Sequence, residues 1–136
     1  MSDRGDSSGS VGIVLVSHSA ELASGLRTLL EQLSAGLVPV AVAGGTEDGG
    51  LGTSYALVAA AIADADRGGG VLVLPDLGSS VLTARLVLAD LERTDLCLVD
   101  APFVEGGVAA AVQASTGADL AAVATAAREA RGFAKF

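Results

Sequence analysis

The stretch VGIVLVSHS, residues 11–19, decides the fold that we predict for the whole chain. Its six apolar residues do not alternate with polar ones, which is typical of a strand covered on both faces in a parallel sheet. The run ends at Ser17, and Ser19 followed by Glu21 is typical of a helix N-terminus. A buried strand that leads directly into a helix indicates the first half of a β-α-β unit.

The same alternation continues along the chain. Leucines at positions 22, 26, 29, 30 and 33 recur at helical spacing, which predicts a helix over residues 20–34 with these leucines on one stripe. A later helix is predicted over residues 81–91, in which Leu82, Leu86 and Val87 occur at helical spacing. The remaining expected elements are strands over 37–43, 71–74 and 96–99 and helices over about 53–66, 107–114 and 118–131.

Four strands that alternate with helices predict an α/β fold. Right-handed crossovers turn such a chain into one four-stranded parallel sheet with helices on both faces, and we expect the strand order 2-1-3-4. Residues 11–131 form the predicted domain. The polar stretch MSDRGDSSGS, residues 1–10, is expected to be a disordered leader, and residues 132–136 a C-terminal tail.

Composition narrows the classes of function. Of the 136 residues, 51% are apolar, which is enough for the core of one domain. Eight basic and sixteen acidic side chains give a net charge of −8, and such a surface repels a nucleic-acid backbone. The sole lysine is Lys135, next to last, so neither a Walker-type P-loop nor a Schiff base has a candidate residue within the chain.

Cysteine and histidine each occur once. Cys97 cannot form an internal disulfide, and together with His18 it is too little for a Cys/His zinc site, so no metal site is expected. No apolar run approaches the ~18 residues needed to cross a bilayer. Residues 1–10 also lack the basic and apolar regions of a signal peptide. The sequence therefore predicts a cytoplasmic protein that does not bind membranes.

Polar residues and glycines gather where the predicted strands end. The first strand ends at Ser17-His18-Ser19, the second at Gly44-Gly45-Thr46, the third at Asp76 before Gly78-Ser79-Ser80, and the fourth at Asp100. In open parallel sheets, ligands bind beyond these carboxyl ends. The sequence therefore predicts a functional site at this edge of the sheet.

His18 is the residue that gives this site its chemistry. A neutral imidazole is a nucleophile near pH 7. If the first and third strands are neighbours, Asp76 can hold one ring nitrogen as N–H, so that the other presents its lone pair. Glycine loops and helix N-termini nearby expose N–H groups that suit a phosphoryl group.

Each of these residues also has a purely structural interpretation. His18 could be an ordinary loop residue at a strand end, and Asp76 could be a helix N-cap. The stretch 44–52 matches neither G-x-G-x-x-G nor G-x-x-x-x-G-K and could form turns. Asp100 is interpreted as a turn residue before Pro102.

Four segments in order resemble one known family: VGIVLVSHSAELASGL, AVAGGTEDGGLGTS, VLVLPDLGSS and VDAPFVEGGVAAAVQAS. Together they are similar to the phosphotransferase subunits of PEP-dependent dihydroxyacetone kinases, in the mannose-type EIIA superfamily. The similarity spans about residues 11–131. The segments V-S-H-S, A-G-G-T…G-T-S and D-L-G-S favour this branch over the sugar-transport branch. The resemblance implies a mannose-type EIIA fold, commonly a homodimer.

The resemblance also implies a function. His18 matches the family's phosphorylated histidine, which takes a phosphoryl group from the phosphocarrier HPr and passes it to ADP held on the subunit DhaL, while the subunit DhaK binds dihydroxyacetone. Asp76 corresponds to the acidic residue beside the histidine. No cofactor is implied on this chain, because ADP or ATP and magnesium are expected on DhaL. The residues expected to bind the phosphoryl group are Ser17, Ser19, Gly45, Thr46, Gly78 and Ser79.

Other functions stay open. The chain could be the EIIA component of a sugar permease, with a different acceptor, or a regulatory binding module that transfers no phosphate. A phosphatase with Asp76 as nucleophile would have no supporting lysine or metal site. Some relatives continue into HPr-like and enzyme-I-like domains, whereas this sequence stops at Phe136, so a separate HPr is expected. A carrier must serve two partners, so we expect His18 on an exposed rim.

Overall fold

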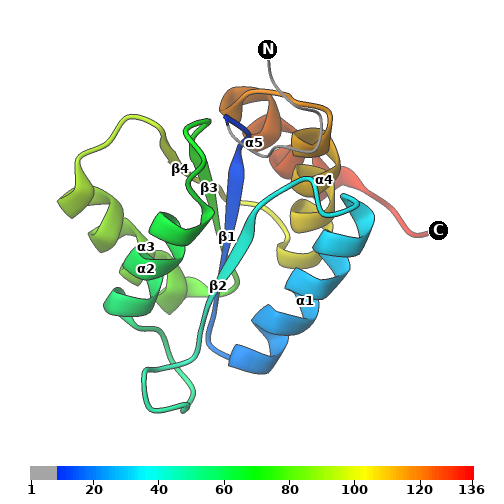
Figure 1. Cartoon of the computed structure of the whole chain (residues 1–136). Coiled ribbons are helices and arrows are strands. Elements are labelled where there is room, and N and C mark those ends of the chain that lie inside the picture. Colours follow the sequence, from blue (N-terminus) through cyan, green and yellow to red (C-terminus); the bar gives the residue numbers. More distant parts are fainter. Residues whose placement is uncertain (1–8) are drawn as a thin grey trace.

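The computed structural model describes residues 9–136, so the expected leader lies outside the described residues except for Gly9 and Ser10. Strands and helices alternate along the chain (Figure 1). The strands are β1 (Gly12–Ser17), β2 (Val40–Gly44), β3 (Val71–Pro75) and β4 (Leu96–Leu98). The helices are α1 (Ala20–Leu33), α2 (Tyr55–Ala65), α3 (Gly78–Leu91), α4 (Phe103–Ser115), α5 (Leu120–Glu129) and a 3-10 turn, η1 (Ala130–Gly132).

The strands form one parallel sheet in the order β2-β1-β3-β4, which confirms the predicted topology. The central strand β1 is held on both sides. Its last residue, Ser17, pairs with Gly44 of β2, and Val16 pairs with Pro75 of β3. The carboxyl ends of these three strands therefore coincide at one edge of the sheet.

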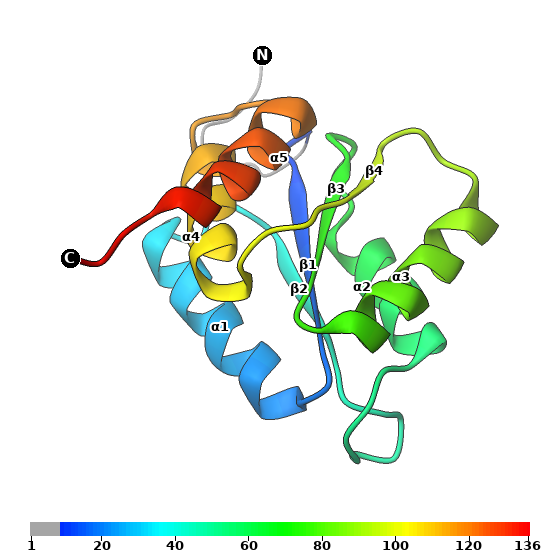
Figure 2. The same ribbon diagram turned by 180° about the vertical axis from the view of Figure 1, so that it is seen from behind.

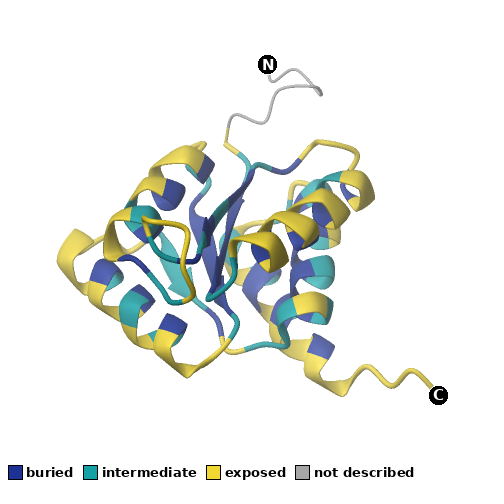
Figure 3. Ribbon diagram, turned by 90° about the horizontal axis from the view of Figure 1, so that it is seen from below, coloured by how far each residue is buried: buried dark blue, intermediate teal, exposed yellow. Residues whose placement is uncertain are grey.

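Helices cover both faces of the sheet. Figures 1 and 2 show α1, α4 and α5 on one face and α2 and α3 on the other. Alternate side chains of β1 divide between the two layers: Ile13 and Leu15 pack in the first core, and Val14 and Val16 in the second. The buried sheet lies between helices whose outer sides are exposed (Figure 3). No helix within residues 9–136 is both long and apolar enough to traverse a bilayer.

The third helix differs from its prediction in where it begins. It begins at Gly78 rather than at residue 81. The carboxylate of Asp76, just before the helix, accepts hydrogen bonds from the backbone N–H of Leu77 and the hydroxyl of Ser80 and so holds this first turn. Of the three apolar residues at helical spacing, only Val87 is buried, whereas Leu82 and Leu86 are 67% and 57% exposed. The residues of α3 that are buried are Ser80, Ala84 and Val87.

The leucine stripe of α1 is buried only in part. Leu26 and Leu30 lie in the core, whereas Leu22, Leu29 and Leu33 are exposed at the margin of the helix. The two helices after β4 also differ from expectation: α4 begins earlier, at Phe103, and the segment predicted as 118–131 is divided into α5 and η1. These differences leave the order of the elements unchanged.

Candidate functional site

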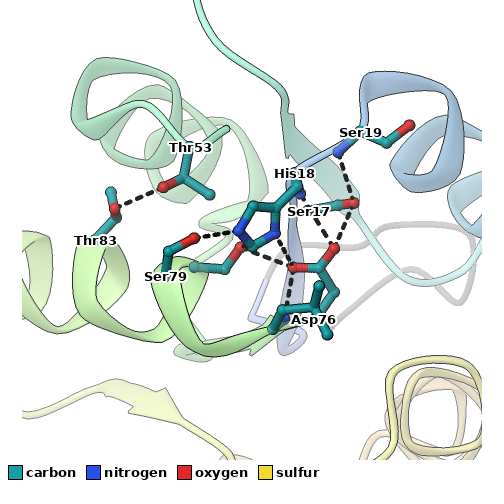
Figure 4. A network of polar contacts seen from close by, with 9 residues as sticks. Ser17, His18, Ser19, Thr53, Asp76, Ser79 and Thr83 are labelled. Atoms are coloured by element: carbon teal, nitrogen blue, oxygen red, sulfur yellow. Dashed lines mark hydrogen bonds and ion pairs between the residues drawn. The ribbon is translucent and has the colours of Figure 1, made fainter. Parts of the chain in front are cut away.

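The residues that follow β1 and β3 meet at the edge of the sheet. The backbone N–H of Asp76 donates to the carbonyl of Val16 at 2.9 Å, which extends the β1–β3 ladder by one residue. His18 Nδ1 then lies 2.9 Å from Asp76 Oδ1 (Figure 4). The imidazole is 26% exposed, whereas the carboxylate is only 8% exposed. The ring thus lies at the surface with the carboxylate beneath it.

Asp76 receives a dense set of hydrogen bonds. Its Oδ1 accepts from the Leu77 N–H at 2.7 Å and from the Ser80 hydroxyl at 2.8 Å. Its Oδ2 accepts from the Ser17 hydroxyl at 2.9 Å and from the His18 N–H at 3.1 Å. Burial raises the pKa of Asp76, but the hydrogen bonds from Ser80, Ser17 and His18 outweigh it and leave the pKa below its ordinary value. Asp76 is therefore anionic at neutral pH.

The anionic carboxylate of Asp76 determines the tautomer of the neutral imidazole. Asp76 can only accept hydrogen bonds, so in the neutral ring Nδ1 carries the proton and Nε2 presents its lone pair. The hydroxyl of Ser79, in the first turn of α3, contacts Nε2 (Figure 4). Nε2 is therefore the ring nitrogen that carries the lone pair, on the side of the ring that faces Ser79.

The hydroxyls of Ser17 and Ser19, on either side of His18, hydrogen-bond to other groups of the protein. Ser17 is fully buried, and its hydroxyl donates to Asp76 and accepts from the Ser19 N–H at 3.1 Å. The Ser19 hydroxyl accepts from the Leu22 N–H at 3.2 Å and caps α1, pointing away from the ring in Figure 4. In this structure the Ser17 hydroxyl therefore holds the carboxylate of Asp76, and the Ser19 hydroxyl caps a helix.

The loop after β2 contacts the backbone of His18 rather than its ring. The Gly45 N–H donates to the Ser17 carbonyl at 2.9 Å, and the Thr46 hydroxyl is engaged with the carboxylate of Asp48. Neither group has a hydrogen bond to the imidazole. Instead, the Gly52 N–H donates to the His18 carbonyl at 3.1 Å. Gly45 and Thr46, expected to bind phosphate, therefore shape the loop that holds His18 in place.

Two residues of the expected set, Gly78 and Ser79, lie in the first turn of α3. The N-cap, Leu77, provides no side-chain hydrogen bond to this turn. The first N–H groups of α3 therefore lack the capping hydrogen bond that a Ser or Asp side chain commonly accepts. Together with the Ser79 hydroxyl, they form a polar surface beside Nε2 that suits an anion.

Ser80 is a site residue that the sequence analysis did not select. It is fully buried, and its hydroxyl donates to Asp76 and lies 3.3 Å from His18 Nδ1. A signal was present in the sequence: a serine four residues after an aspartate at the start of a helix lies one turn above it. Recognising it required the helix to begin at Gly78, three residues before the predicted start.

A groove of about 700 Å³ opens beside Asp76, between the start of α3 and the end of β4. Leu77, Arg85 and Asp100 are among its lining residues, whereas His18 is not. The carboxylate of Asp100 pairs with Arg131 at 3.0 Å and takes no part in the His18 network. Within residues 9–136, no three His, Cys, Asp or Glu side chains gather in a way that could hold a metal ion.

Comparison with known proteins identifies the family. Residues 12–124 match the EIIA-man family model, described as "PTS system fructose IIA component". A DhaM protein of Listeria innocua, the phosphoryl donor subunit of PEP-dependent dihydroxyacetone kinase 2, is 37% identical over 76% of this chain and 85% of its own length. The chain belongs to the DhaM branch of the mannose-type EIIA family. This confirms the resemblance found in the sequence.

Other members of the family agree. The DhaM phosphotransferase subunit of Lactococcus lactis is 35% identical over 82% of this chain and 89% of its own length. The DhaM protein of Escherichia coli is 40% identical over 81% of this chain, which matches only 25% of that longer protein. A crystal structure of a protein of unknown function, EF1359, superposes with a TM-score of 0.82 at 34% identity, covering 93% of this chain and 98% of that one. The EIIA-type fold predicted from the sequence is thereby confirmed.

Proposed function

We propose that this chain is the phosphoryl-carrying subunit of a PEP-dependent dihydroxyacetone kinase, with His18 Nε2 as the carrier atom. The observation that supports the proposal most is the His18–Asp76 contact of 2.9 Å, which leaves Nε2 as the free nucleophile of a partly exposed ring. The names of the Listeria and Lactococcus relatives supply the acceptor system. HPr is the proposed phosphoryl donor.

The proposed reaction consists of two phosphoryl transfers. In the first, the lone pair of His18 Nε2 attacks the phosphorus of phosphorylated HPr. The N–P bond of HPr breaks, and a new N–P bond forms on His18. In the second, a terminal phosphate oxygen of ADP on DhaL attacks the same phosphorus, so that ATP forms and His18 returns to its neutral state. DhaK would bind the dihydroxyacetone that ATP then phosphorylates, and magnesium would be bound with the nucleotide on DhaL.

Asp76 and the start of α3 have separate roles in this proposal. While phosphorus is bonded to Nε2, the ring carries positive charge, and the anionic Asp76 at Nδ1 stabilises it. The Ser79 hydroxyl and the N–H groups of the first turn of α3 would donate to the phosphoryl oxygens. Ser17 and Ser80 act on Asp76 and do not need to touch phosphate. We further propose that the chain works as a homodimer.

Incubation with PEP, enzyme I and HPr tests the proposal. The protein should gain one phosphate that is labile in acid and stable in base, and His18→Ala should gain none while keeping its circular dichroism spectrum, since the ring is partly exposed and packs in neither core. Phosphate uptake by His18→Ala would refute the assignment.

The acceptor is tested with the phosphorylated protein itself. It should form ATP with DhaL–ADP and should not phosphorylate the EIIB component of a sugar permease. The reverse result would assign the chain to sugar transport. Native mass spectrometry would show whether the phosphorylated species is the proposed dimer.

A further inference from the structure

Ser79, His18 and Asp76 form a connected row of side chains at the edge of the sheet (Figure 4). The Ser79 hydroxyl contacts His18 Nε2, and His18 Nδ1 lies 2.9 Å from Asp76 Oδ1. Serine hydrolases use the same order: a carboxylate orients an imidazole, and the imidazole takes the proton of a serine hydroxyl. Such a triad is recognised by its geometry and not by the positions of its residues in the sequence. The row of three therefore suits a second kind of chemistry.

The exposure of the serines around His18 selects one of them as a nucleophile. Among residues 9–136, three serine side chains hydrogen-bond to His18 or Asp76, namely Ser17, Ser79 and Ser80. Ser17 and Ser80 are fully buried, whereas Ser79 is exposed. Asp76 accepts from Nδ1, so Nε2 has the lone pair that can receive the Ser79 proton. A substrate can thus approach the one hydroxyl that faces the base.

The start of α3 offers donors for the negative oxygen that forms when a serine attacks a carbonyl group. Within the described residues, the backbone N–H groups of Gly78 and Ser79 have no hydrogen-bond acceptor, whereas the Ser80 N–H donates to the Leu77 carbonyl at 3.0 Å. Free N–H groups beside the nucleophile stabilise such an oxyanion. The positive end of the helix dipole acts in the same direction.

The groove beside Asp76 provides room for the acyl part of a substrate. Gly78, which directly precedes Ser79, lines this groove, as do the apolar side chains of Leu77, Val81 and Leu98. Its volume of about 700 Å³ is within the range of small-molecule sites. A short, apolar acyl chain therefore fits the space next to the nucleophile.

We propose that this chain also hydrolyses esters of short-chain carboxylic acids, with Ser79 as the nucleophile and His18 as the general base. Asp76 is the positioning residue, because it acts on the substrate only through the ring. This activity goes beyond phosphoryl transfer, in which Ser79 only donates a hydrogen bond. Both activities use Nε2, so a phosphorylated His18 would be unable to act as the base.

The proposed reaction has two steps. In the first, Ser79 Oγ bonds to the carbonyl carbon of the ester and its proton moves to His18 Nε2. The bond to the alcohol oxygen breaks, and the alcohol leaves with that proton. In the second, water attacks the acyl carbon and gives a proton to Nε2. The bond to Ser79 Oγ then breaks, and Oγ recovers its proton from Nε2. One ester and one water become one carboxylic acid and one alcohol.

Hydrolysis of 4-nitrophenyl butyrate, followed by the release of nitrophenolate, tests the proposal. The wild type should be faster than free imidazole at the same concentration. Ser79→Ala and His18→Ala should each lower kcat/KM about 100-fold or more, since a positioned general base contributes about 10²–10⁴-fold. Ser24→Ala is the matched control, an exposed serine of α1 away from His18, and should keep the wild-type rate. Circular dichroism and urea unfolding establish that each variant is folded.

Two further measurements assign the roles. A fluorophosphonate, which reacts with activated serine hydroxyls, should label the peptide that contains Ser79, as seen by mass spectrometry, and should not label Ser79→Ala or His18→Ala. Asp76→Asn should lower kcat about 10-fold or more and leave KM unchanged, because Asp76 orients the ring and does not bind the ester. A KM that rises while kcat is retained would overturn the role given to Asp76.

Three results would overturn the proposal. One is a wild type that is no faster than free imidazole. Another is a full rate in the folded Ser79→Ala variant, which would make His18 itself or the thiol of Cys97 the nucleophile. The third is full ester hydrolysis by protein that carries phosphate on His18. A chain that hydrolyses the ester but takes no phosphate from HPr would refute only the proposed function, so the two failures are distinguishable.

Discussion

Asp76→Asn isolates the contribution of one carboxylate to phosphoryl transfer. The substitution keeps the size of the side chain but replaces one hydrogen-bond acceptor with an NH₂ donor and removes the negative charge. A hydrogen bond to a charged group contributes about 1.5–3 kcal/mol. If the transition state loses one such bond at Nδ1, transfer from phosphorylated HPr should slow about 10- to 150-fold. Rapid-quench measurement of phosphate on His18 gives this rate.

The same substitution should also destabilise the fold. Whichever oxygen it replaces, the amide nitrogen cannot accept the bonds made there. These come from the Leu77 N–H and the Ser80 hydroxyl at Oδ1, and from the Ser17 hydroxyl and the His18 N–H at Oδ2. A buried N–H group without an acceptor costs about 1–3 kcal/mol, and urea unfolding should show a loss of this size. Asp90→Asn is the matched control, because Asp90 belongs to the same helix but is bonded to the Tyr55 hydroxyl, away from His18.

The pH dependence of stability adds an independent check on Asp76. Its pKa in the folded protein lies below the ordinary value, so the folded state favours the anion, and this stabilisation is complete above about pH 4. As the pH falls through the lowered pKa, the stabilisation is lost. The gap in unfolding free energy between the wild type and Asp76→Asn should therefore narrow below about pH 4. Equal transfer rates and a constant gap would refute the role given to Asp76.

Two further substitutions test other parts of the structure. Ser79→Ala removes the hydroxyl at Nε2 and should slow transfer about 10-fold with little change in stability, since Ser79 is exposed; an unchanged rate in the HPr assay would remove it from the site. Gly12→Ala would press a Cβ against the Ala65 carbonyl oxygen, so α2 would have to move away from β1. The free energy of unfolding, measured in urea, should fall by about 1–3 kcal/mol. An unchanged stability would contradict the close packing of α2 on β1.

The sequence predicted the parts of the molecule that depend on strong, local patterns. The uninterrupted apolar run ending at Ser17 located the central strand, and the rule that ligands bind at strand ends selected His18 and Asp76 together. The loop at Gly45 and Thr46 was harder, because its hydrogen bonds close within the loop and onto the backbone of β1. Nothing in its composition distinguishes such a loop from one that donates to a ligand.

The side of α3 that faces the sheet could not be predicted from periodicity. Apolar residues occur on both sides of this helix, so Leu82 and Leu86 appeared as suitable for burial as Ala84 and Val87. Ser80 lies on the buried side together with Ala84 and Val87, and its hydroxyl bonds to Asp76. Hydrophobic periodicity does not take account of such a buried polar contact.

The ladder between β1 and β3 has a consequence for how this chain tolerates change. His18 and Asp76 follow directly after the paired ends of β1 and β3. A shift of the β1–β3 pairing by one residue would therefore move Asp76 about 3.3 Å along the strand and out of reach of Nδ1. The pairing of the two strands thus fixes the distance between His18 and Asp76. Substitutions on the exposed sides of the helices that leave this register unchanged should be tolerated. An insertion of a single residue in β1 or β3 should instead separate His18 from Asp76 and abolish phosphate uptake.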